Sequence, residues 1–237
     1  MKKEMSHKSS KFNFKNLILG GQDGIVNVLG LVLGVASATA DKKIVIIAGL
    51  VSLVAESISM GAVAYTSSKA AKEYYQSRIK EEEQEIREQP KTEIKQIREL
   101  YYNKGFRGKL LSSIVNKITS DKKTWAKTIM QEEHNLSPEE YEKPLSVAAI
   151  VGLATVIGSI IPILPFFLLN IKNGIITSLI FSAIILFIVG ALKAKLSIGN
   201  WKRSGLELML IGIVCAVIGY GVGLLLKIIF GLNGVIV

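Results

Sequence analysis

The sequence predicts an all-α membrane protein in which five transmembrane helices carry a cytosolic helical domain, inserted between helices 2 and 3. About half of the 237 residues are apolar (49%), and they concentrate in two blocks, 17–66 and 145–237, on either side of a charged segment. A helix needs about 20 mainly apolar residues to cross a hydrocarbon core about 30 Å thick. The two blocks contain five runs of that length, near 17–39, 44–67, 145–169, 174–193 and 206–230.

These runs divide the chain into four parts. A polar tail occupies 1–16, transmembrane helices 1 and 2 occupy 17–68, the inserted domain occupies 69–143, and helices 3 to 5 occupy 144–237. The tail lacks the short apolar core and the small-residue cleavage site of a signal peptide, so we interpret it as cytosolic.

The distribution of positive charge predicts the orientation. The formal net charge of +10 comes mainly from the tail and from the loop 193–203, whereas the inserted segment is nearly balanced. Because cytosolic loops are rich in Lys and Arg, we expect the N-terminus, the inserted domain and this loop in the cytosol and the C-terminus outside. Contact with anionic lipid headgroups explains the surplus better than nucleic acid does. We expect a prokaryotic cell membrane rather than a vacuolar one, because the chain is rich in Lys and Ile and shows no organelle signal.

Two acidic residues lie at membrane depth. Asp23 is in the first span and Glu56 is in the second, with Met60 one helical turn beyond Glu56. An acidic side chain in the bilayer costs roughly 2.5–3.5 kcal/mol on insertion scales, so such residues usually serve a function. Two carboxylates and a thioether suit a divalent transition metal such as ferrous iron or manganese.

Each acid belongs to a stripe of small and polar residues at helical spacing. The first stripe is Asp23, Asn27, Gly30 and Gly34, and the second is Gly49, Ser52, Glu56, Met60 and Val63. Small residues let helices approach closely in lipid. We therefore expect the stripes to face each other, or their copies in a homodimer, and to bring the acids and the methionine together. The alternative is a pair of packing seams whose acids are protonated or hydrogen-bonded.

The inserted domain is expected to be entirely helical. No helix breaker occurs between Tyr65 and Pro90, so the second helix should continue out of the membrane as far as that proline. Thr92 is predicted as the N-cap of the next helix, and Gly105 as its end. Further helices are predicted over 107–118 and 121–134, with a new cap at Ser137-Pro138.

Acidic residues cluster in this domain. Glu82 and Glu85 share one helix face, Glu93 opens the next helix, and Met130 and Glu133 share a face just before a histidine. Carboxylates from separate helices are the usual ligands of a metal site in a helical protein. The sequence therefore predicts a metal-binding domain. The alternative is a set of solvated helix faces, because charge runs such as KEEEQEIRE are normally exposed.

No enzyme and no resident cofactor are predicted. No Glu-x-x-His pair occurs twice, as a di-iron oxidase site would need, and there is no glycine motif for a nucleotide. Cys215 is the single cysteine and cannot form an internal disulfide, so it is expected to be a small packing residue.

Several motifs taken together resemble the vacuolar iron transporter family: DGIVNVLGLVLG in the first span, SISMG in the second and IPILPFF in the third. The resemblance covers nearly the whole chain, including the charged helical insertion and the basic turn before GLELMLIG. It implies five transmembrane helices per subunit, a homodimer, and proton-coupled export of ferrous iron, often with manganese, from the cytosol.

The resemblance also implies roles for individual residues. Asp23 and Met60 match family residues that line the translocation path between subunits. The positions that match the family's metal ligands in the inserted domain are Glu82, Glu85, Glu93, Met130 and Glu133.

The chain departs from the family pattern at three positions. Ala64 stands where many members have the glutamate of a Gly-Glu-Tyr motif, and Ser52 stands where others have a second-helix glutamate. We infer that Glu56 replaces one of these. Gln96 stands where a further domain glutamate is expected, which would lower the number or the affinity of the ions bound there.

The expected function is therefore proton-coupled export of a divalent transition metal. Ferrous iron would be collected on the domain glutamates and passed to a membrane site formed by Asp23, Glu56 and Met60 at a homodimer interface. Two alternatives remain: a manganese-preferring exporter of the same family, and a membrane-anchored protein that buffers or senses metal and uses its spans only as an anchor.

Overall fold

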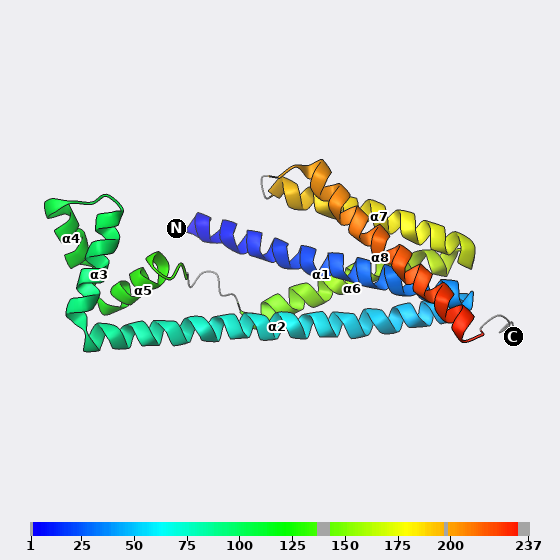
Figure 1. Ribbon diagram of the computed structural model, residues 1–237, viewed down its shortest axis with the longest axis horizontal. Helices are drawn as coiled ribbons and strands as arrows, with labels where there is room; N and C mark the ends of the chain where they lie inside the picture. Colours follow the sequence, from blue (N-terminus) through cyan, green and yellow to red (C-terminus); the bar gives the residue numbers. More distant parts are fainter. Residues whose placement is uncertain (1, 137–142, 197–198, 232–237) are drawn as a thin grey trace. The chain divides into compact units, whose positions relative to one another are not determined.

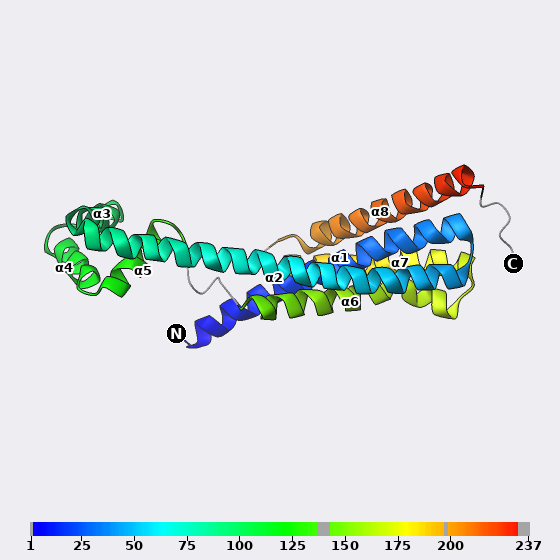
Figure 2. The same ribbon diagram turned by 90° about the horizontal axis from the view of Figure 1, so that it is seen from below.

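A computed structural model describes the backbone of residues 2–136, 143–196 and 199–231, and the side chains in these ranges from residue 14 on, apart from residue 196. All regular structure in this part of the chain is helical (Figures 1 and 2). The helices are α1 (Lys2–Thr39), α2 (Lys42–Glu88), α3 (Pro90–Asn103), α4 (Gly108–Thr119), α5 (Lys122–Glu132), α6 (Pro144–Leu168), α7 (Ile171–Leu196) and α8 (Trp201–Ile229). They belong to two compact units, one formed by Met1–Tyr65 with Leu145–Val237 and the other by Thr66–Pro144.

The prediction of five spans is confirmed at the level of length and composition. Five helices are long and apolar enough to cross a membrane: Phe14–Thr39, Lys42–Glu88, Pro144–Leu168, Ile171–Lys195 and Trp201–Ile229. The chain is thus a multi-pass membrane protein. The first helix is longer than expected, because α1 already begins at Lys2, within the segment interpreted as a tail. No Pro or Gly interrupts that segment, so nothing in its sequence stops the helix.

The membrane unit is built around α1, which contacts α6 on one side and α8 on another. Its backbone meets both neighbours at glycines: a methyl group on Gly158 of α6 would overlap the carbonyl of Gly21, and one on Gly219 of α8 would overlap that of Gly30. The Ser37 hydroxyl also donates to the Tyr220 carbonyl of α8 at 2.9 Å. Small residues thus permit backbone contact on both sides of α1.

The core of this unit joins α1 to α2 and α6. Val28, Leu29 and Val32 of α1 are fully buried against Ile163 and Phe166 of α6, together with the first turn of α2. The expected Pro-x-x-Pro segment lies inside α6, at Pro162 and Pro165. A buried hydroxyl of α7, that of Ser178, donates to the Pro162 carbonyl at 2.7 Å and so ties α7 to this part of α6.

The helical unit comprises the end of α2 with α3, α4 and α5. Its core contains Ile86 of α2, Ile97 of α3, Val115 of α4, and Trp125 and Ile129 of α5. Each short helix contributes one apolar face to this core, which is why the amphipathic segments fold back on one another.

Two helix boundaries in this unit differ from the prediction: the start of α3 and the end of α5. The expectation that Thr92 caps α3 is wrong: α3 begins at Pro90 after Gln89, because proline fits the first helical position, where no N–H is needed. The expected extension of the 121–134 helix to His134 is also wrong. Helix α5 ends at Glu132, and Asn135 takes a left-handed conformation (φ 55°) that turns the chain. The expected cap at Ser137-Pro138 lies outside the described residues.

We predict that Gly219→Ala destabilises the membrane unit by about 1–3 kcal/mol, because the added methyl group forces α8 away from α1. Gly221→Ala is the matched control on the same helix, since a methyl group there meets no atom of the described residues within 4 Å. Thermal unfolding in detergent should show a lower Tm for the first variant and an unchanged one for the second. Equal Tm values would contradict the close contact between α1 and α8.

Candidate metal sites

The first candidate site is a pair of carboxyl groups in the membrane unit. Asp23 of α1 and Glu56 of α2 lie close enough to hydrogen-bond to each other. The Asn27 amide, one turn along α1 from Asp23, donates its Nδ2 hydrogen to Glu56 Oε1. A direct hydrogen bond between two carboxyl groups requires one proton, and two ionised carboxylates at this separation require a cation. The pair can therefore hold either a proton or a metal ion.

Met60 lies one turn beyond Glu56 on α2. It packs against Val147 and Val151 of α6, beside Ala64. The structure thus brings the two acids together, while the thioether of Met60 lies in an apolar contact.

The predicted stripes face each other only in part. The polar residues of the α1 stripe meet α2, through the contacts of Asp23 and Asn27 with Glu56. Gly30 and Gly34, at the other end of that stripe, pack instead against α8. The stripe on α1 therefore contacts two helices: its polar residues contact α2, and its glycines contact α8.

The second candidate site is a cluster of three glutamates in the helical unit. Glu82 and Glu85 of α2 and Glu93 of α3 each offer a carboxylate oxygen within 4.8 Å of the others. Glu82 is only 2% exposed and Glu93 only 5%, and each has a buried oxygen with no hydrogen-bond partner among the described residues. Buried carboxylates without partners are unfavourable, and oxygen ligands at this spacing suit a divalent cation.

The pKa of Glu93 shows how burial and neighbouring charges act within this cluster. Burial raises the pKa of the Glu93 carboxyl above its ordinary value, and the negative charges of Glu82, Glu85 and Glu133 raise it further. Four acids thus act on one another in a space that a cation would neutralise.

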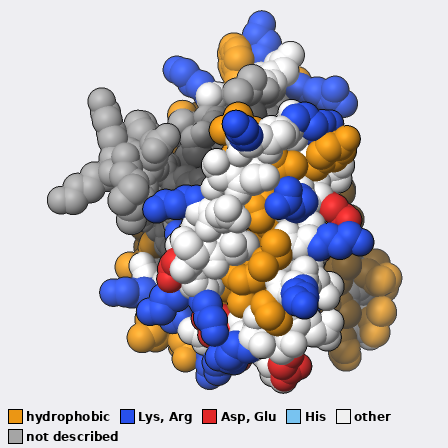
Figure 3. Space-filling model, turned by 90° about the vertical axis from the view of Figure 1, so that its left-hand side faces the viewer, with side chains coloured by type: hydrophobic (Ala, Val, Ile, Leu, Met, Phe, Trp, Pro, Cys, Tyr) orange, Lys and Arg blue, Asp and Glu red, His pale blue; other side chains and the backbone are white. Residues whose placement is uncertain are grey.

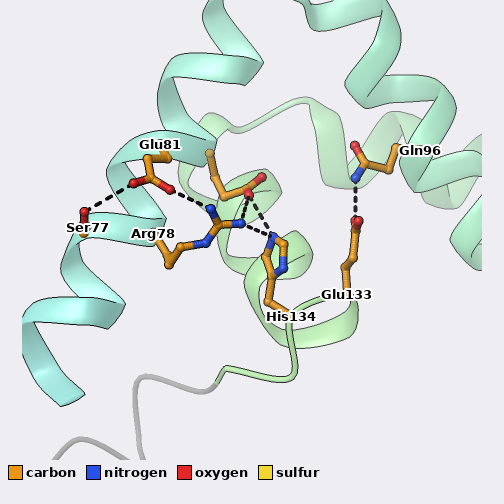
Figure 4. A network of polar contacts seen from close by, with 7 residues as sticks. Ser77, Arg78, Glu81, Gln96, Glu133 and His134 are labelled. Atoms are coloured by element: carbon orange, nitrogen blue, oxygen red, sulfur yellow. Dashed lines mark hydrogen bonds and ion pairs between the residues drawn. The ribbon is translucent and has the colours of Figure 1, made fainter.

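The other two predicted ligands lie differently. Met130 is fully buried in the helical unit. Glu133 is exposed at the end of α5, and its Oε2 accepts a hydrogen bond of 2.6 Å from the Gln96 amide (Figure 4). Glu133 is therefore near enough to affect Glu93 but is held by Gln96 outside the closest group of three.

Two basic side chains beside Glu82 received no role from the sequence. His134 Nε2 lies 2.8 Å from Glu82 Oε1. The Arg78 guanidinium lies 3.3 Å from the same Nε2 and 3.6 Å from Glu82 Oε1, and it binds Glu81 at 2.6 Å (Figure 4). The i, i+4 spacing of Arg78 and Glu82 could have suggested their pairing. The approach of His134 could not be foreseen, because His134 follows the C-cap Glu133 and its place depends on how the chain leaves α5.

Charge is segregated along the helical unit. Residues 104–127 contain a single acid, Asp121, and the basic residues Lys104, Arg107, Lys109, Lys117, Lys122, Lys123 and Lys127. Figure 3 shows a face on which Lys and Arg side chains far outnumber acidic ones around an apolar strip. Among the described residues, the acids of this unit other than Asp121 thus lie on α2, on α3 and at the end of α5, and the first two of these helices carry the glutamate cluster.

These features define a class: multi-pass α-helical membrane proteins with paired acids inside the spans and a carboxylate cluster in an inserted helical segment. Comparison with known families gives the particular assignment. A family model described as "VIT family" matches residues 14–224, and the chain belongs to that family.

Relatives agree with this assignment. The chain is 28% identical to "Vacuolar iron transporter 1" of Arabidopsis thaliana, over 85% of this chain and 81% of that protein. It is 26% identical to "Vacuolar iron transporter 1" of Tulipa gesneriana, over 92% and 88%. It is 29% identical to "Vacuolar iron transporter" of Toxoplasma gondii, over 98% and 80%. The resemblance inferred from the motifs is thereby confirmed at the level of the family.

We predict that the metal-free helical unit loses stability as the pH rises from the ordinary glutamate value of 4.5 through the raised pKa of Glu93. In this window the folded chain holds more protons than the unfolded chain, so a rise in pH favours unfolding. Thermal unfolding with a chelator present, followed by fluorescence of the buried Trp125 in a Trp201→Phe background, measures this slope. Glu93→Gln should flatten it, and a slope of opposite sign would show that Glu93 is not the responsible group.

Proposed function

We propose that this protein is a proton-coupled exporter of divalent transition metal, with ferrous iron as its main cargo. In this proposal the N-terminus and the helical unit lie in the cytosol, and two copies form a homodimer. Glutamates of the helical unit collect the ion, and Asp23, Glu56 and Met60 of both subunits bind it inside the membrane. The family membership and the printed names of the relatives support iron as the cargo.

The observation that carries the proposal is the contact between Asp23 and Glu56 across two apolar helices. An anchor would need one span and no acids within it, because acids at membrane depth are costly. Two acids in contact at this depth form a binding site for an ion within the membrane. A protein that only buffers or senses metal has no use for such a site.

The same pair supplies a route to proton coupling. When metal is bound, both carboxylates are ionised and are neutralised by the ion. When metal leaves, a proton returns to the pair, because two unneutralised carboxylates in contact repel each other strongly in a medium of low dielectric constant. Metal and proton thus compete for one place.

Cargo selection would follow from the ligand types. Oxygen ligands alone would also accept magnesium or calcium, whereas a thioether from Met60 would favour softer transition ions. Since Met60 of one subunit lies in an apolar contact with α6, its part in binding would require a small movement of α2 or a ligand contribution across the dimer.

Metal flux into proteoliposomes, with ferrous iron or manganese outside and an imposed pH gradient, tests the proposal. Iron flux that depends on the gradient is the expected result. Faster manganese flux would point to the manganese-preferring alternative. Metal binding without flux of either ion would mean that the protein buffers or senses metal.

We predict that Asp23→Asn abolishes flux and that Glu56→Gln lowers it at least roughly tenfold and weakens its dependence on the pH gradient, since each removes a charge but keeps the size of the side chain. Glu207→Gln, the same kind of change at an acid of α8 outside the pair, is the control and should leave flux unchanged. All variants should insert in the membrane and elute like the parent. Full flux through Asp23→Asn would refute the membrane site.

We predict that Gln96→Glu strengthens binding of Mn²⁺ to the glutamate cluster, on the order of tenfold, because it adds a carboxylate and removes the amide that holds Glu133. The matched control is Gln84→Glu, since Gln84 also donates through its amide to a glutamate, Glu88, but on an exposed face of α2. Calorimetry on the full-length protein measures the affinity. A larger gain for Gln84→Glu than for Gln96→Glu would contradict the location of the site.

A further inference from the structure

The contacts around Glu82 cannot all be favourable at once. His134 Nε2 lies 2.8 Å from a Glu82 oxygen and 3.3 Å from the Arg78 guanidinium. A neutral imidazole nitrogen either donates a hydrogen bond or accepts one. If Nε2 donates to Glu82, its N–H faces an N–H of Arg78. If Nε2 accepts from Arg78, its lone pair faces the lone pairs of Glu82. One of the two contacts is unfavourable in either tautomer.

A metal ion removes this conflict when the Arg78 guanidinium turns from Nε2 toward Glu81, which it already binds. Two ligands bound at about 2.1 Å and at right angles lie about 3 Å apart, so the separation of Nε2 and Glu82 Oε1 fits adjacent positions around one ion. The proton of the imidazole would then lie on Nδ1, and the lone pair of Nε2 would point at the ion. Arg78 would keep its bond of 2.6 Å to Glu81 without needing Nε2.

Further oxygen atoms for a metal site lie close to Glu82. Its second oxygen is buried and has no hydrogen-bond partner among the described residues, and the same holds for one oxygen of Glu93. Glu85 and Glu93 offer oxygens within 4.8 Å of one from Glu82. Glu82 thus belongs to the group of carboxylates and also contacts the imidazole. His134 lies outside the group whose ligand atoms are all within 4.8 Å of one another, so an ion shared by all four side chains requires Nε2 to move toward Glu85 and Glu93.

We propose that His134 is a nitrogen ligand of the metal bound at Glu82, Glu85 and Glu93, so that this cluster binds transition metals through mixed nitrogen and oxygen ligands. The inference rests on the proposed role of the cluster in collecting metal. Its consequence is a change in selectivity. Imidazole binds iron, cobalt and zinc well, whereas magnesium and calcium prefer oxygen, so the nitrogen ligand discriminates against the abundant hard cations.

The chain offers a clean test because it contains two histidines, His7 and His134. The full-length protein, purified with a tag that lacks histidine, is loaded with Co²⁺, which resists oxidation. Cobalt K-edge X-ray absorption then detects imidazole ligands through their characteristic outer-shell scattering. We expect this scattering in the parent protein and in His7→Gln, and we expect its loss in His134→Gln.

Affinity provides the second measurement. His134→Gln should weaken Co²⁺ binding at least roughly tenfold, the scale on which even supporting residues of metal sites act. The affinity for Mg²⁺ should change less, so the ratio of the two affinities should fall. His7→Gln should change neither.

The possible outcomes separate this inference from the proposed function. If imidazole scattering is absent from the parent, or persists in His134→Gln, His134 is not a ligand and the inference is overturned. If the scattering is absent but Glu82→Gln with Glu85→Gln still abolishes Co²⁺ binding, the carboxylate site stands without His134. If neither His134→Gln nor the double glutamate variant changes Co²⁺ binding, the cluster does not collect metal, and that part of the proposed function fails as well.

Discussion

The contact of the α1 backbone with α6 and α8 is the constraint on which the membrane unit depends. Lipid chains are as apolar as the helices, so helices in a bilayer associate through close packing rather than through the hydrophobic effect. In α1 the glycines that permit this packing lie on either side of Asp23 along the chain, at Gly20 and Gly24 and then at Gly30. The position of the carboxyl group is therefore determined by backbone contacts on the helix that bears it. Glu56 reaches Asp23 from α2, whose contact with α6 at Gly61 is looser.

The two candidate sites handle buried negative charge in different ways. In the membrane unit the acids meet each other and an amide, Asn27, so that one proton or one cation satisfies them. In the helical unit the basic side chains of Arg78 and His134 contact Glu82, while one buried oxygen of Glu93 has no hydrogen-bond partner in the part of the chain that the structure describes. Such partial neutralisation leaves negative charge available for a cation, as the proposed collection and release of an ion requires.

Much of the fold could be predicted because its determinants are local. Runs of apolar residues predict the spans, and Pro90 predicts the end of α2, since proline cannot continue a helix. The meeting of Asp23 and Glu56 was expected from the polar parts of the two stripes. The partner of Gly30 could not be derived, because a small residue permits any close neighbour, and here the neighbour is α8. The position of His134 could not be predicted either, because this residue lies where the chain leaves α5, just before the left-handed Asn135.

Two residues beside the glutamate cluster, Gln96 and His134, act together in the proposed site. Gln96, at a position where the family pattern suggests an acid, removes one negative charge and holds Glu133 by a hydrogen bond of 2.6 Å. His134 places an imidazole nitrogen 2.8 Å from Glu82. Removing a carboxylate weakens the attraction for every divalent cation alike, because that attraction depends on charge. Adding an imidazole restores affinity only for ions that accept nitrogen. Under the proposed role of His134, these two residues together exchange general electrostatic affinity for chemical selectivity. They do so in a space where burial, and then the charges of Glu82, Glu85 and Glu133, raise the pKa of Glu93.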